Sequence, residues 1–254
     1  LFAVKRLIGR TYNDPMTQKD MSLVPYQIVK GGNGDAWVNA DGKQYSPSQI
    51  SAFTLQKMKE TAEAFLGQQV TQAVITVPAQ FSDIQRQWTS EAGKLAGLER
   101  VDIINEPVAA ALCHVLGEGN WFAEIANDQT VMVFDLGGGT FDLSLVKYNK
   151  DKVTVIASGG DLNLGGLDWN KCLETYACDQ FVKECPSDPR LDKETMQAVS
   201  LEIEQAKRSL SVRPRAAVTL THAGRRKAIA IDRDTFEKLS AQLVKRCEEI
   251  TIGT

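Results

Sequence analysis

The residues from Asp135 to Asp142 have the composition of a phosphate-binding turn. The segment reads Asp-Leu-Gly-Gly-Gly-Thr-Phe-Asp and lies between two apolar segments that we expect to be strands. Because glycine lacks a Cβ atom, the backbone N–H groups of Gly137–Gly139 can approach a phosphate closely. Asp135, Thr140 and Asp142 offer oxygens of the hard type that magnesium prefers. The segment therefore predicts a site for a phosphate and a magnesium ion.

Two familiar phosphate loops do not fit this segment. No Gly-Lys-Ser/Thr follows, as a Walker A loop requires, and the glycine spacing is not that of the dinucleotide fingerprint. Taken alone, a glycine-rich hairpin without a ligand remains an alternative. A second stretch, Gly159-Gly160-Asp161 followed by Gly165-Gly166, is expected to form another glycine turn. Two such turns favour phosphate binding.

Two further polar segments are open to two interpretations each when taken alone. Glu106 follows an apolar strand and precedes a proline, so it marks either a helix start or a carboxylate aimed at a metal or water. Residues 204–211 are expected to be helical, with Glu204 and Lys207 on one face. This face is either a solvated surface or a contact for a nucleoside, with the guanidinium of Arg208 stacked on a base.

Strands and helices alternate along the chain, which predicts an α/β fold. Short strands are expected within residues 23–45, and caps at Ser46-Pro47 and Ser82–Gln85 predict helix starts. Buried strands are expected at Ala73–Val77, Val101–Ile104 and Val131–Phe134. The other expected elements are helices ending at about 67, 97 and 116, helices over 168–184, 191–211 and 234–250, and strands over 141–146, 153–157, 216–220 and 227–231.

The pattern divides into two blocks, which predicts two α/β lobes with a cleft between them. Residues 1–121 are expected to form a partial first lobe and residues 122–254 the second, with a hinge over the polar residues 117–130. Within the second lobe we expect a sheet subdomain over about 122–164 and a helical and hairpin subdomain over about 165–243. We expect both ends of the domain to be truncated, because no initiator methionine and no clear helix stop are present.

The bulk composition narrows the class of partner. The 254 residues carry a net charge of −3, so nucleic acid is not an expected partner. Five cysteines without a CxxC pair and only two histidines argue against a zinc site and fit a reducing compartment. No apolar run approaches the ~20 residues that span a bilayer, so no membrane contact is expected.

Five motifs occur in an order that resembles the DnaK family of seventy-kilodalton heat-shock chaperones. They are Lys5–Arg10, Val74–Ala79, Ile104–Pro107, Phe134–Asp142 and Leu164–Gly166. The resemblance covers essentially the whole chain and implies the actin-like (ribonuclease H-like) two-lobed ATPase fold. It implies ATP or ADP with Mg²⁺ as ligands, ATP hydrolysis driving a protein-folding cycle, and a J-domain co-chaperone and a nucleotide exchange factor as partners. It also implies the bacterial cytoplasm or the mitochondrial matrix as location.

The resemblance implies a role for each matched residue. Lys5 corresponds to a lysine that positions the attacking water and γ-phosphate, and Glu106 and Asp135 to carboxylates that hold magnesium through water. Asp142 corresponds to a carboxylate near the attacking water. The other matches are Gly137, Gly138, Gly139 and Thr140 for the phosphate loop, Thr140 also for catalysis, Gly165 and Gly166 beside the nucleotide, Glu204, Lys207, Arg208 and Ser211 for ribose and adenine, and Pro78 with Arg86 for allosteric switching.

Several departures from the family pattern leave rival functions open. Gln80, Val108 and Leu167 stand where tyrosine, threonine and glutamate are usual. The family's first phosphate loop and its second adenosine motif are not within the 254 residues, and neither is a domain for unfolded client peptides. One rival is therefore a non-catalytic interaction fragment of a chaperone. A second is a sugar kinase of the same fold, against which the long chaperone-type motifs argue.

Overall fold

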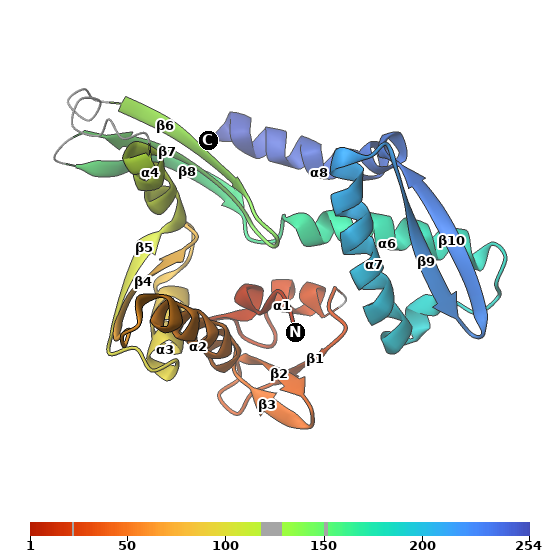
Figure 1. Ribbon diagram of the computed structural model, residues 1–254, viewed down its shortest axis with the longest axis horizontal. Coiled ribbons are helices and arrows are strands. Elements are labelled where there is room, and N and C mark those ends of the chain that lie inside the picture. Colours follow the sequence, from red (N-terminus) through yellow and green to blue (C-terminus); the bar gives the residue numbers. More distant parts are fainter. Residues whose placement is uncertain (22, 118–128, 150–151) are drawn as a thin grey trace. The chain divides into compact units, whose positions relative to one another are not determined.

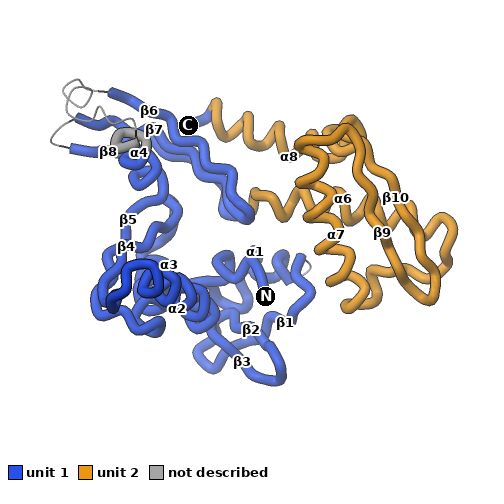
Figure 2. Tube along the Cα trace, in the orientation of Figure 1, with its two compact units in different colours: residues 1–162, 253–254 blue, residues 163–252 orange. Residues whose placement is uncertain are grey.

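The computed structural model describes residues 1–21, 23–117, 129–149 and 152–254 (Figure 1). The hinge predicted over 117–130 lies almost entirely outside these residues. The chain forms two compact units, unit 1 with residues 1–162 and 253–254, and unit 2 with residues 163–252 (Figure 2). This boundary lies near the subdomain boundary predicted at about 164. The predicted division into lobes at about residue 121 stays a prediction.

The elements follow the predicted alternation of strands and helices. The strands of unit 1 are β1 (Gln27–Lys30), β2 (Ala36–Ala40), β3 (Lys43–Tyr45), β4 (Gln72–Val77), β5 (Arg100–Asn105), β6 (Gln129–Leu136), β7 (Phe141–Tyr148) and β8 (Val153–Asp161). Its helices are the 3-10 helix η1 (Val4–Leu7), α1 (Pro15–Asp20), α2 (Pro47–Leu66), α3 (Asp83–Leu95) and α4 (Glu106–Gly117). Unit 2 contains α6 (Gly166–Val182), the 3-10 helix η2 (Pro189–Leu191), α7 (Lys193–Val212), β9 (Arg215–His222), β10 (Arg225–Asp232) and most of α8 (Arg233–Gly253).

The sheets of unit 1 bring distant segments of the chain together. β1, β2 and β3 form an antiparallel sheet, β4 and β5 form a parallel pair, and β6, β7 and β8 form a second antiparallel sheet (Figure 1). Val77 at the end of β4 pairs with Asn105 at the end of β5. Pro78 and Glu106, which follow these residues, therefore leave the parallel pair at the same edge.

The cap predicted at Ser46 and the capping box predicted at Ser82 both begin helices, and each forms a complete capping box. At the start of α2, the Ser46 hydroxyl accepts the N–H of Gln49 at 3.2 Å, and the Gln49 side chain accepts the N–H of Ser46 at 2.9 Å. Ser82 and Gln85 exchange the equivalent bonds at the start of α3. Gly67 ends α2 in the left-handed conformation, with φ of 67°.

The 3-10 helix η1 packs into two apolar clusters of unit 1 and is thereby fixed in position. Val4 and Leu7 join one cluster with residues of β1 and β2. Ile8, which follows η1, joins a second cluster with Val77 and Phe81. Because its apolar residues are held on both sides, η1 presents Lys5 and Arg6 from a rigid segment.

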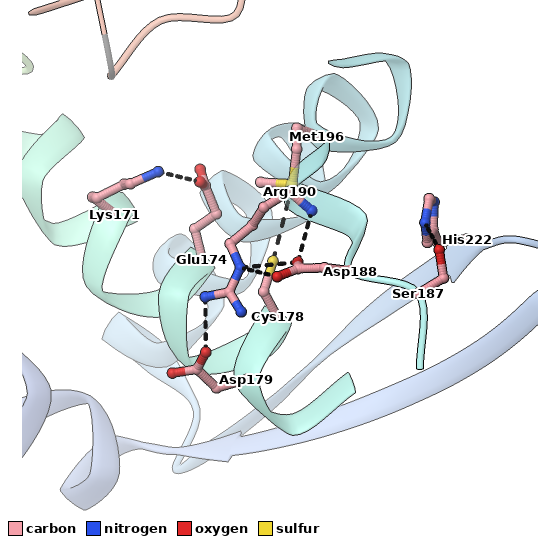
Figure 3. A network of polar contacts seen from close by, with 9 residues as sticks. All are labelled: Lys171, Glu174, Cys178, Asp179, Ser187, Asp188, Arg190, Met196 and His222. Atoms are coloured by element: carbon pink, nitrogen blue, oxygen red, sulfur yellow. Dashed lines mark hydrogen bonds and ion pairs between the residues drawn. The ribbon is translucent and has the colours of Figure 1, made fainter. Parts of the chain in front are cut away.

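In unit 2, helices α6 and α7 pack against the β9–β10 hairpin. Phe181, Ile203, Leu210 and Leu220 are fully buried or nearly so in this core. Polar contacts hold the segment between α6 and α7 against the rest of unit 2. The hydroxyl of Ser187 lies within hydrogen-bonding distance of the His222 ring (Figure 3). Arg190 pairs with Asp188 and with Asp179 of α6.

One predicted turn is wrong. Gly159-Gly160-Asp161 is the end of β8, where Gly160 pairs with Asp142 of β7. Gly160 has φ of 152°, and a Cβ atom there would lie 2.4 Å from the carbonyl oxygen of Phe141. Glycine is required because β8 approaches β7 closely, not because the chain turns.

All five cysteines are free thiols. Among the helices of the described residues, none combines the length and the apolar character that crossing a bilayer demands.

Candidate functional site

The glycine turn lies at the tip of the β6–β7 hairpin, as predicted. The ladder closes with Leu136 opposite Phe141, and the N–H of Gly137 donates to the carbonyl of Thr140 at 2.9 Å. The expectation of three free glycine amides is therefore wrong for Gly137, because its N–H is used within the turn. In the described ranges no acceptor faces the N–H groups of Gly138, Gly139 and Thr140. These three amides remain available to an anion.

Gly138 is the accessible point of this turn. It is exposed, and a Cβ atom added to it would meet none of the described residues within 4 Å. The open space beside it suits an approaching ligand oxygen.

Asp142 is a buried carboxyl group at the base of the turn. The residue is 2% exposed, and neither carboxyl oxygen accepts a hydrogen bond of good geometry in the described part of the chain. Burial raises the pKa of Asp142 to about 6, and the charges of Glu106 and Asp135 raise it too. The charge of Lys5 and the nearby hydroxyl of Thr140 lower it. Burying a polar group without a good hydrogen bond costs free energy, so this carboxyl group is suited to bind a ligand that hydrogen-bonds to it.

Lys5 and Glu106 form an ion pair beside this carboxyl. Lys5 Nζ lies 2.7 Å from Oε1 of Glu106, at the first residue of α4. The Glu106 side chain is 17% exposed and that of Lys5 47% exposed. Lys5 Nζ also lies 5.8 Å from the centre of the Phe81 ring. Segments from η1 and α4 thus place a cation and a carboxylate near the β6–β7 tip.

Arg6, which has no predicted role, holds the backbone of the turn. Arg6 donates to the carbonyl oxygen of Gly139 from Nε at 3.0 Å and from Nη2 at 2.7 Å. Arg6 adjoins Lys5 in a matched motif, but no local pattern indicates a partner 133 residues away. This contact comes from the tertiary fold alone.

The carboxylates fit a hydrated magnesium ion better than a directly bound metal. No three side chains of histidine, cysteine, aspartate or glutamate within the described residues form a direct metal site. Asp135 is exposed near the end of β6, opposite Asp142 in the ladder. Magnesium usually keeps several waters and needs only one or two carboxylates. Glu106, Asp135 and Asp142 offer such oxygens.

In unit 2, the predicted ribose and adenine contacts on α7 are joined by ion pairs. Glu204 accepts bonds from Asn170 at 2.8 Å, Lys207 at 2.8 Å and Arg208 at 2.9 Å. Burial opposes ionisation of Glu204, but the bonds from Lys207, Asn170 and Arg208 lower its pKa to about 2. Arg208 keeps its side chain 79% exposed, so its planar guanidinium remains open on one face.

The glycines of unit 2 form the start of α6 rather than a separate loop. Gly165 precedes the helix, and its N–H donates to the Asp168 carboxylate at 2.9 Å. Lys207 donates to the carbonyl of Gly166 at 3.1 Å, which ties α7 to this helix start. Ser211 lies exposed one turn further along α7.

Pro78 and Arg86, predicted as a pair, are in contact. The Arg86 guanidinium donates to the carbonyls of Phe81 at 3.0 Å, Ala79 at 3.1 Å and Pro78 at 3.5 Å. Arg86 therefore fixes the turn between β4 and α3. The allosteric role of the pair stays a prediction.

A family model described as Hsp70 protein matches residues 1–252, nearly the whole chain. The nucleotide-binding domain of that family is actin-like. The mixture of helices with several sheets agrees with that fold, so the predicted actin-like α/β class is confirmed.

Proposed function

The chain belongs to the Hsp70 family, and we propose that the residues around its glycine turn bind the phosphates of ATP or ADP with a hydrated Mg²⁺ ion. Hsp70 proteins are ATPase chaperones that use ATP or ADP with Mg²⁺ and work with co-chaperones and nucleotide exchange factors. The observation that carries the proposal is Asp142. Its buried carboxyl accepts no hydrogen bond of good geometry within the described residues, and it lies near Lys5 and Glu106 and beside a turn whose amides at Gly138–Thr140 are unused there.

Each group of the site has a distinct task in this proposal. The N–H groups of Gly138, Gly139 and Thr140 donate to phosphate oxygens. Lys5 supplies positive charge next to the terminal phosphate, and its bond to Glu106 keeps it in place. Magnesium, when bound, neutralises charge on the phosphates.

Asp142 acts on the attacking water in this proposal. With a pKa of about 6 it is ionised at neutral pH. A carboxylate with a pKa near the working pH can orient the water and accept its proton as the bond to phosphorus forms.

The residues of α6 and α7 are proposed to contact the nucleoside. Glu204, fixed by three donors, and Lys207 offer polar contacts for a ribose. The exposed guanidinium of Arg208 offers a flat surface for a base, and Ser211 and the backbone at Gly165 and Gly166 complete the proposed set.

At a finer level, we propose a chaperone of the DnaK type. Its partners would be a J-domain co-chaperone and a nucleotide exchange factor, with unfolded peptides bound by a domain outside residues 1–254. Its location would be the bacterial cytoplasm or the mitochondrial matrix. The basis is the order of the five motifs, which includes Lys5–Arg10 and Phe134–Asp142.

The test is a titration of ATP into the protein as its gene encodes it, with Mg²⁺ and then with a chelator. We expect binding that depends on Mg²⁺. In parallel, Asp135→Asn should reduce phosphate release more than ATP affinity, because the charge matters most in the transition state. Absence of ATP binding with Mg²⁺ would contradict the proposal, and equal turnover in the variant would remove Asp135 from the mechanism.

A further inference from the structure

We propose that Arg6 is a positioning residue that fixes the peptide unit between Gly139 and Thr140, and so aims the Thr140 N–H group at the bound phosphate. The inference rests on the proposed function, because it assumes that the turn binds phosphate. Its basis is the pair of bonds from Nε and Nη2 of Arg6 to the Gly139 carbonyl oxygen, at 3.0 and 2.7 Å.

Peptide geometry converts this carbonyl contact into control of an amide. The Gly139 carbonyl and the Thr140 N–H belong to one trans peptide unit, so they point in opposite directions. Fixing the oxygen on Arg6 therefore directs the N–H away from Arg6. Glycine permits backbone angles that other residues avoid, so an unrestrained peptide here could rotate. Rotation would present the carbonyl oxygen, which repels a phosphate, in place of the N–H group.

Arg6 is itself held rigidly enough for this task. It is 6% exposed and lies in η1, whose neighbours Val4 and Leu7 are buried. Its Nη1 atom lies 3.6 Å from Oδ1 of Asp20, which is 3% exposed. The planar guanidinium can thus face Asp20 with one nitrogen while two others donate to Gly139.

Arg6→Lys is the decisive variant, because it keeps a positive charge near Asp20 but removes the pair of N–H groups that donate to the Gly139 carbonyl. In the gene-encoded protein with Mg²⁺, we expect ATP and ADP affinity to fall about tenfold to a hundredfold. Adenosine, which lacks phosphates, should bind with unchanged affinity. In the ligand-free protein, the NMR amide resonance of Thr140 should shift. Arg10→Lys is the matched control: Arg10 follows η1 and pairs with Asp14 at 3.3 Å.

The outcomes separate this inference from the proposed function. Unchanged ATP affinity in Arg6→Lys would overturn the inference, as would equal losses for ATP and adenosine, which indicate a purely structural role. If the unmodified protein binds no ATP, the proposed function fails. In that case the Thr140 amide resonance of the ligand-free protein tests the inference alone. The same resonance in Arg6→Lys and the parent would overturn control of the peptide unit by Arg6, and a shifted resonance would support it.

Discussion

The ammonium nitrogen of Lys5 lies 2.7 Å from Oε1 of Glu106, although the two residues are 101 positions apart in the chain. The contact joins η1 to the first residue of α4. It keeps a cation beside the glycine turn and the buried carboxyl of Asp142, on whose pKa both residues act.

Replacing Lys5 should separate true ATP hydrolysis from contamination. We expect Lys5→Ala to reduce the rate of phosphate release about a hundredfold or more, because one charge stabiliser of the transition state is lost. Lys30→Ala, at an exposed position of β1, is the control and should keep the parent rate. Equal rates in Lys5→Ala and the parent would assign the activity to a contaminant or to other residues.

The stability of the metal-free protein should depend on the protonation of Asp142. Its pKa is about 6 in the folded chain and 3.8 ordinarily, so the folded state binds more protons between these values. Stability should therefore rise as pH falls from about 6 to about 4. Above pH 6 the ionised carboxyl costs at most about 3 kcal/mol.

Urea unfolding in the presence of a chelator measures this effect. Asp142→Asn should lose the pH dependence between about 4 and 6, while Asp102→Asn, at an exposed position, should keep it. The same slope in Asp142→Asn and the parent would show that another group is responsible.

Much of the local structure was predictable, because the signals lie within a few residues. Ser82 with Gln85 forms a capping box from side chains three positions apart, and Ser46 followed by proline marks a helix start, so both starts follow from local sequence. The Gly137–Gly139 hairpin tip was predictable because the glycines lie between two apolar strands.

What the sequence did not predict depends on contacts between distant segments. The bond from Arg6 to Gly139 spans 133 positions, and no local pattern indicates it. The pattern at Gly160 predicts a turn, because glycine occurs both in turns and in closely paired strands, and only the register with Asp142 distinguishes the two. The buried state of Asp142 likewise follows from packing.

The His222 contacts should stabilise unit 2 without affecting nucleotide binding. Its ring nitrogens lie 2.9 Å from the Ser187 hydroxyl and 3.2 Å from that of Thr195, and the ring packs edge-on against Phe181. His222→Ala should lower the free energy of unfolding by about 1–3 kcal/mol. Thr221→Ala, an exposed change on the same strand, should lie within about 0.5 kcal/mol of the parent. Equal stability of the two variants in urea would show that the His222 contacts contribute little.

Residues 1–254 should associate through exposed apolar strands when expressed as this chain. In the described sheets β4 and β6 each pair on one side only, and Val74, Met132 and Phe134 are 60%, 55% and 50% exposed. Such edges favour pairing between molecules. Light scattering should show oligomers that Val74→Lys with Met132→Lys reduces. A monodisperse monomer of the unmodified chain would contradict this expectation.

The most direct test of the phosphate site compares two glycines by calorimetric titration of ATP with Mg²⁺ into the gene-encoded protein. At both Gly138 and Gly32, no atom of the described residues lies within 4 Å of an added Cβ, so valine should be tolerated structurally at either position. Gly138→Val places a branched side chain at the free amides of the turn, and we expect ATP affinity to fall at least about a hundredfold, or ~2.7 kcal/mol. Gly32→Val should bind as the parent does. Equal affinity in the two variants would contradict the assignment of the Gly137–Thr140 turn as the phosphate site.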